Sequence, residues 1–136
     1  MGVILDSSVL IDFDRRSLDV EQMLEALKLP EAEIVAISAV TLMEFATGVA
    51  LADSDVRRAR RKQFLEDLQW QLPVLPFDSD LAVRTGELNG DLRKGGITVG
   101  SIDLMIGVTA LVVGYSVVTR NVRHFRIIPG LDVVEV

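Results

Sequence analysis

Short apolar runs alternate along the chain with segments of helical periodicity. Runs short enough for strands fall at 3–5, 33–37, 72–77, 115–119 and 132–136. Most are rich in Val and Ile and lack strict alternation, which is typical of parallel strands covered on both faces. We therefore predict five buried strands in a parallel arrangement.

Between these runs, apolar residues recur at helical spacing. A helix over 19–29 places Val20, Met23, Leu24 and Leu27 on one face. A second helix, with Ser38 as its N-cap, runs to about Ala52 and places Leu42, Phe45, Ala46 and Val49 together. Further helices are expected to begin near Ser7 and to span 54–69, 79–94 (closed by Gly95-Gly96) and 101–113. Strands that alternate with helices indicate right-handed crossovers and a parallel sheet between helical layers.

Length and composition are those of a soluble globular protein. A chain of 136 residues, 49% of them apolar and 25% charged, favours one domain over 1–136. The absence of cysteine excludes disulfides and thiolate metal sites, and it fits a reducing cytoplasm.

No membrane or secretory segment is expected. The N-terminus lacks the basic start and cleavage site of a signal peptide. The most apolar run, "LMIGVTALVVGYSVV" at 104–118, is shorter than the ~20 residues that span a bilayer. It is flanked by Asp103 and Arg120. We interpret it as a buried helix followed by a buried strand.

The formal net charge of −6 argues against a nucleic-acid partner, because phosphate binding usually requires a basic protein. Bound divalent cations reverse the field of an acidic site, so the charge does not decide the matter.

Four polar residues are expected to meet at one edge of the sheet. Asp6 directly follows the first strand, and Asn121 follows the fourth within "TRN". Glu44 lies two turns into the helix after the second strand, and Asp103 lies in the first turn of the helix before the fourth. In parallel sheets, ligands bind beyond the carboxyl ends of the strands.

Each of these residues also has a simpler interpretation. Asp6 in an isolated "LDSS" favours a helix cap, and Glu44 is consistent with a solvated helix side. Asp103 is favoured in a first turn by the helix dipole, although its helix is apolar nearly all round and should bury it. Asn121 is a common turn residue. The glycines at 100 and 107 leave room beside Asp103 for a ligand.

Together the acids indicate a metal site. Three carboxylates a few ångströms apart repel one another unless a cation lies among them. Oxygen ligands without nitrogen or sulfur suit Mg²⁺ or Mn²⁺, which activate water and stabilise a leaving oxygen in phosphodiester hydrolysis. The lone His124 is interpreted as structural, since no second histidine or cysteine completes a zinc site.

Four motifs resemble the PIN-domain ribonucleases, most closely the VapC-type toxins of bacterial toxin–antitoxin pairs. They are "VILDSSVLIDF", "ISAVTLMEFATG", "DLRKGGITVGSIDLMIGVTAL" and "VVTRNVRHF", in this order over essentially the whole chain. The resemblance implies a three-layer α/β/α fold with a five-stranded parallel sheet and a Mg²⁺- or Mn²⁺-dependent endoribonuclease.

The resemblance also assigns residues. Asp6, Glu44 and Asp103 take the family's acidic positions and are expected as metal ligands. Asn121 stands where many members carry a fourth acid, which leaves a second metal ion open. Thr119 is expected to be a supporting hydroxyl. The implied partners are an RNA substrate, a small antitoxin that covers the acidic cleft and a second copy of the chain in a homodimer, all in the cytoplasm.

The basic cluster "RRARRK" at 57–62 remains open between solvent, RNA and an acidic antitoxin segment. Its charges spread over more than half of the helix circumference, so at least one is expected to meet protein or ligand.

Two alternatives to the nuclease remain. A phosphotransfer domain also places an acid after its first strand, but a phosphatase needs a second Asp where this chain has Ser8. A receiver domain needs acidic neighbours before the strand-end Asp and a late Lys, and neither is present. A binding module with a degenerate site is supported by Asn121 and opposed by the three retained acids.

Overall fold

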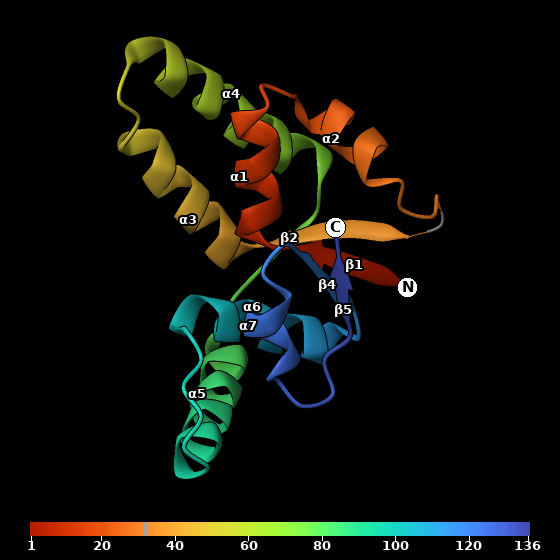
Figure 1. Cartoon of the computed structure of the whole chain (residues 1–136), viewed down its shortest axis with the longest axis vertical. Helices are drawn as coiled ribbons and strands as arrows, with labels where there is room; N and C mark the ends of the chain where they lie inside the picture. The colour runs from red at the N-terminus through yellow and green to blue at the C-terminus, as the bar shows by residue number, and fades with distance from the viewer. Residues whose placement is uncertain (32) are drawn as a thin grey trace.

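A five-stranded parallel sheet forms the middle of the protein (Figure 1). The computed structural model describes residues 1–31 and 33–136. The strands are β1 (Gly2–Leu5), β2 (Ile34–Ser38), β3 (Val74–Leu75), β4 (Ser116–Thr119) and β5 (Val133–Glu135), and their order is β3-β2-β1-β4-β5. All the pairings are parallel, as the apolar runs predicted.

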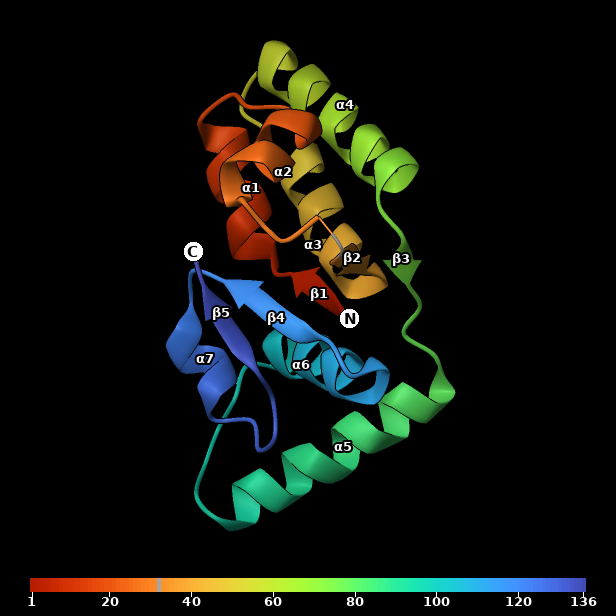
Figure 2. The ribbon, with the colours of Figure 1, turned by 90° about the vertical axis from the view of Figure 1, so that its right-hand side faces the viewer.

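Helices cover both faces of the sheet. They are α1 (Ser7–Arg15), α2 (Val20–Leu27), α3 (Ala39–Ala50), α4 (Asp55–Gln71), α5 (Ser79–Lys94), α6 (Ser101–Val113) and α7 (Val122–Arg126). Helices α1 to α4 lie above the sheet in Figure 2 and α5 to α7 lie below it. The predicted three-layer α/β/α architecture is confirmed.

Each face of the sheet has its own core. Val3 and Leu5 of β1 pack with Phe13, Phe45 and other apolar residues of α1 to α4. Ile4, between them on the strand, packs with Phe125 and the apolar residues of α5 to α7 on the opposite face. Successive residues of a strand face opposite sides of the sheet, and here both sides are buried. The strands are therefore continuous apolar runs.

The pairing of β1 with β4 brings two sequence-distant segments together. Leu5 is in register with Val118, and the Asp6 amide donates to the Val118 carbonyl at 3.0 Å. The next residue of β4 is Thr119. Asp6 and Thr119 therefore lie side by side at the carboxyl edge of the sheet.

Several predicted boundaries differ from the structure. The run at 72–77 yields only the two residues of β3, because Pro73 and Pro76 have no amide hydrogen for a sheet ladder. Ala46, expected on the buried face of its helix, is exposed. The apolar run at 104–118 forms most of α6 and β4. No helix in the described ranges is both long and apolar enough to cross a membrane.

Candidate active site

Asp6 lies at the N-cap position of α1, but its side chain makes no capping hydrogen bond. Instead Oδ2 accepts hydrogen bonds from the Ser8 hydroxyl at 2.7 Å and the Thr119 hydroxyl at 2.9 Å. The Ser7 hydroxyl lies 3.4 Å from Oδ1. Asp6 is only 1% exposed, so these hydroxyls replace most of its lost water. The helix-cap interpretation of this side chain is therefore wrong.

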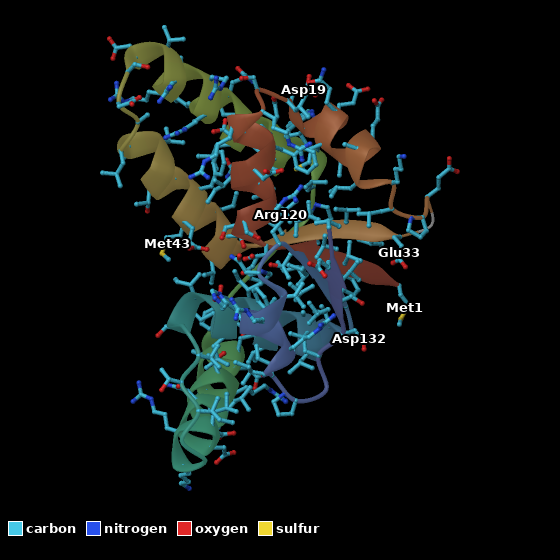
Figure 3. All side chains as sticks on the ribbon, in the orientation of Figure 1. Met1, Asp19, Glu33, Met43, Arg120 and Asp132 are labelled. Atoms are coloured by element: carbon cyan, nitrogen blue, oxygen red, sulfur yellow. The ribbon has the colours of Figure 1, made fainter. Side chains whose placement is uncertain are left out.

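The same hydroxyls tie the loop after β4 to the start of α1. The Thr119 hydroxyl accepts from the Asn121 amide at 2.9 Å while it donates to Asp6. The Ser8 hydroxyl likewise accepts from the Arg120 amide at 3.1 Å. Arg120 lies beside α1 (Figure 3), and its Nη2 is 2.9 Å from Asp12 Oδ2. Thr119 is thus a supporting hydroxyl, as expected.

Glu44 projects from α3 toward the other two acids. Burial raises its pKa above the ordinary value, and a hydrogen bond from the Ser7 hydroxyl partly opposes this rise. The charges of Asp6 and Asp103 each raise the pKa by a smaller amount. Its Oε1 is buried without a hydrogen-bond partner. A buried oxygen of this kind is costly unless a cation or a water satisfies it.

Asp103 lies in the first turn of α6, with its side chain 22% exposed. Burial raises its pKa and the charge of Asp6 adds to the rise, whereas hydrogen bonding to His124 lowers it. The distance from His124 Nδ1 to Asp103 Oδ2 is 2.9 Å. Asp103 is therefore only partly buried, whereas the apolar helix predicted a buried side chain.

His124 is the residue that sequence reasoning missed. The sequence led us to interpret it as structural, because no zinc site could be completed, whereas the structure places it against a carboxylate of the acidic cluster. It belongs to α7, a five-residue helix too short to show periodicity. The available signal was its position three residues after Asn121, which returns it to the same side of a helix.

The two glycines near Asp103 have different roles. A Cβ at Gly100 would lie 3.7 Å from Asp103 Oδ2, so this glycine does border the carboxylate. A Cβ at Gly107 would lie 2.4 Å from Ile128 Cδ1. Gly107 therefore allows close packing against the segment after α7, and the expectation that it makes room for a ligand is wrong.

The structure brings Asp6, Glu44 and Asp103 into one electrostatic cluster at the edge of the sheet. No three acidic or histidine side chains in the described ranges are already gathered closely enough to enclose an ion. An all-oxygen donor set with one unpartnered buried oxygen fits a hard divalent cation that retains several of its waters.

The family model of the PIN domain matches residues 3–131. The chain belongs to the PIN-domain family. A curated relative, Ribonuclease VapC1 of Rickettsia felis, is 31% identical over 136 residues, which cover 100% of this chain and 97% of the relative. The tRNA(fMet)-specific endonuclease VapC of Salmonella typhimurium is 36% identical over 97 residues, 71% of each protein.

Solved structures agree with the fold of this PIN domain. The DNA-bound VapBC of Salmonella typhimurium superposes with a TM-score of 0.82 and 30% identity, covering 99% of this chain and 98% of that one. The promoter-bound VapBC2 of Rickettsia felis gives a TM-score of 0.84 at 22% identity, covering 100% and 99%.

Two cavities flank the acids of the PIN domain. One, of about 190 Å³, lies between α1, α3 and α4 and is lined by Ile11, Asp14, Arg15, Glu44, Phe45, Gly48 and Arg61. The other, of about 220 Å³, is lined by Arg120, Asn121, Val122, Arg123, His124 and Glu135. Asn121 makes no side-chain cap bond to α7, so its amide is available in the second cavity.

The basic cluster at 57–62 is largely neutralised within the protein. Arg57 and Arg58 pair with Asp53 and Asp55 on the surface. Arg61 donates to the buried Asp14 at 3.2 Å and to the Gly48 carbonyl at 2.9 Å. The expectation that part of this cluster meets protein is confirmed, because Arg61 joins α4 to both α1 and α3.

Proposed function

We propose that this PIN domain is a Mg²⁺- or Mn²⁺-dependent endoribonuclease and the toxin of a toxin–antitoxin pair. The nuclease class follows from the family and from relatives that are VapC ribonucleases. The observation that carries the metal dependence is the acidic cluster, in which Asp6 is buried under hydroxyls and Glu44 keeps an unpartnered oxygen.

Asp6 and Asp103 are the direct ligands in this proposal, and Glu44 acts directly or through a bound water. Such an ion activates water as a nucleophile and stabilises charge on the leaving oxygen. Thr119 and Ser8 fix the orientation of Asp6 through their hydrogen bonds, and His124 does the same for Asp103. Asn121 orients the water or the RNA from the edge of the second cavity.

RNA is the proposed substrate, and transfer RNA is the first class to test, because the Salmonella relative is named a tRNA(fMet)-specific endonuclease. An antitoxin is the proposed partner, since the VapBC structural neighbours are toxin–antitoxin complexes. A cytoplasmic place of action belongs to the same proposal.

A homodimer is also proposed. Val83 on α5 and Val112 and Val113 on α6 are 60%, 46% and 41% exposed, respectively. These two helices pack against each other and carry a cavity of about 290 Å³ lined partly by Leu88, Leu111 and Val112. Association of two copies across this face would remove apolar surface from water.

The decisive experiment incubates the purified protein with total bacterial RNA and with transfer RNA. Cleavage should require added Mn²⁺ or Mg²⁺, stop with EDTA and fall by about 100-fold or more in Asp6→Asn, because a ligand charge is lost while side-chain volume is kept. Asp132→Asn is the matched control. Asp132 is exposed and lies just before β5, at the edge of the sheet opposite to the acidic cluster.

Full activity in Asp6→Asn would contradict this mechanism. Absence of cleavage by the wild type, with a correctly folded protein and added metal, would instead favour the degenerate binding module.

A further inference from the structure

The arginines of this protein fall into two groups. Seven lie within 4.0 Å of a carboxylate, namely Arg16, Arg57, Arg58, Arg60, Arg61, Arg84 and Arg120. Within residues 1–31 and 33–136, the arginines without such a partner are Arg15, Arg93, Arg123 and Arg126. These four exposed guanidinium groups are not compensated by a described carboxylate within 4.0 Å, so they can pair with a ligand.

Two of these four, Arg15 and Arg123, line the cavities beside the acidic cluster. Arg15 ends α1 and lines the cavity that contains Glu44. Arg123 lines the cavity that contains Asn121 and His124, and Arg126 follows it by one turn on α7. Arg93 lies in the last turn of α5, at the lower end of the molecule in Figure 2, away from the sheet.

The position of these arginines matters because an acidic protein must bind a polyanion. The protein carries a net charge of −6, and its site is acidic, so a polyanion is repelled overall. Acids also line the two flanking cavities, but Asp14 is already paired with Arg60 and Arg61, and the exposed Glu135 shares its cavity with two arginines. Arg15 and Arg123 therefore supply local positive charge on opposite sides of the cluster.

We propose that Arg15 and Arg123 bind backbone phosphates on either side of the scissile bond. An RNA strand would then cross the acids from the cavity beside α1 and α3 to the cavity beside α7. Arginine suits this role because its planar guanidinium binds phosphate oxygens in a bidentate manner. This inference rests on the proposed function, since it names the path of the substrate through the same site.

The test compares Arg15→Ala/Arg123→Ala with Arg93→Ala/Lys62→Ala. The control removes the same charge at two exposed positions without a carboxylate partner in the described chain. Binding of fluorescently labelled, unfractionated bacterial tRNA is measured in EDTA over a salt series. Because phosphate contacts are largely independent of sequence, this probe need not contain the cleavage site.

The site variant should bind this tRNA about 10-fold more weakly than the control at low salt. Its slope of log K against log salt should be smaller by about 0.7 to 0.9 for each lost contact. In cleavage assays KM should rise while kcat changes by less than about twofold, since the lost contacts hold substrate and transition state alike. Arg15→Lys/Arg123→Lys should recover most of the salt slope, which also shows that truncation did not act through misfolding.

Equal affinities and salt slopes in the site and control variants would overturn the inference, as would a wild type that does not bind tRNA. A site variant that loses affinity only for the purified antitoxin would show that these arginines serve that protein instead. If tRNA binding responds as expected but the wild type cleaves no RNA, the binding path stands and the proposed hydrolysis fails.

Discussion

The oxygens of Asp6 are held by hydroxyls rather than by cations. Ser8 and Thr119 both donate to Oδ2, and no arginine or lysine in the described chain pairs with this carboxylate. This buried carboxylate therefore has hydroxyl partners but no cationic side chain beside it. That is a poor arrangement for stability alone and a suitable one for a cation ligand.

Thr119→Val tests the importance of this support. Valine keeps the shape of threonine but removes the donor to Asp6 and the acceptor for the Asn121 amide. We expect a loss of about 1–3 kcal/mol in the free energy of unfolding and a 10- to 100-fold weaker Mn²⁺ affinity, roughly the cost of deleting an outer-shell partner. Chemical denaturation and Mn²⁺ titration measure the two effects.

Thr109→Val is the matched control for this substitution. Thr109 is also buried, but its hydroxyl donates only to the Met105 carbonyl within α6. It should leave Mn²⁺ affinity unchanged. Equal Mn²⁺ affinities in the two variants would mean that the Thr119 hydroxyl does not organise the site.

The sequence was informative about this site where a candidate residue follows a strand. Asp6 and Asn121 are strand-end residues, and the parallel pairing of β1 with β4 brings their loops together. His124 was not placed because α7 has only five residues, too few for periodicity, and its spacing from Asn121 was a weak signal. The hydroxyl contacts to Asp6 depend on a register between strands more than 100 residues apart, which a single sequence does not specify.

At the scale of elements, α6 must approach the segment after α7 closely. Gly107 makes this possible, because a Cβ there would lie 2.4 Å from Ile128 Cδ1 and 3.3 Å from Leu131 Cδ2. Ile128 is 2% exposed and has little room to move. This contact also sets the position of α7, which carries His124 to Asp103.

Gly107→Ala should therefore lower the free energy of unfolding by about 1–3 kcal/mol through overpacking. Gly90→Ala on α5 should raise it by roughly 0.5–1 kcal/mol, because no atom lies within 4 Å of the new Cβ and alanine favours a helix. Thermal and urea unfolding of both variants decide the matter. A neutral Gly107→Ala would show that α6 does not need this close approach.

The contact between α1 and α4 depends on a buried ion pair. Asp14 is 4% exposed, and Arg61 donates to it from α4, with Arg60 Nε at 3.7 Å as a weaker second partner. Truncating Arg61 leaves that carboxylate poorly compensated in the interior.

Arg61→Ala should cost about 2–3 kcal/mol of unfolding free energy, somewhat less than a fully uncompensated buried charge because Arg60 remains. Arg57→Ala is the surface control, since its pair with Asp53 is exposed and should contribute about 0–1 kcal/mol. Urea denaturation compares them. Similar losses in the two variants would remove the distinction between the buried and the surface pair.

Element prediction from sequence succeeded where a segment was long or strongly apolar. The helices α5 and α6 begin and end at the predicted residues, and a glycine follows each of them, Gly95 and Gly114. It failed for β3, because the prolines on either side of this strand limit the pairing that the apolar pattern alone suggested. It also assigned a buried face to Ala46, which tertiary packing leaves exposed.

At the scale of the whole molecule, the fold gathers acids that would be farther apart in an unfolded chain. Burial is the largest cause of the raised pKa values of Glu44 and Asp103, and the charges of neighbouring acids add to it. Without a bound cation, the fold therefore holds protons on these two groups more tightly than the unfolded chain does. A divalent cation reverses that preference, because it binds the deprotonated forms.

The pH dependence of stability follows from these directions. The ordinary pKa values are 4.5 for Glu44 and 3.8 for Asp103. As pH rises from these values toward the raised ones, the folded state holds protons that the unfolded chain has released. The free energy of unfolding contributed by this pair is therefore greatest below the ordinary values and falls as pH rises through the raised ones. Added Mn²⁺ or Mg²⁺ should restore stability in that upper range, by about 2.7 kcal/mol at a concentration of 100 Kd.

Unfolding of the wild type and of Glu44→Gln/Asp103→Asn across a pH series, in EDTA and in Mn²⁺, isolates this contribution from that of other carboxylates. In EDTA the wild type should lose stability relative to the variant as pH rises, and only the wild type should gain a metal-dependent increase in Tm at neutral pH. A stability difference in EDTA that does not change with pH would mean that the acids do not destabilise the empty fold. A Tm gain of equal size in the variant would place the ion elsewhere on the protein, because the variant retains only Asp6 of the three acids.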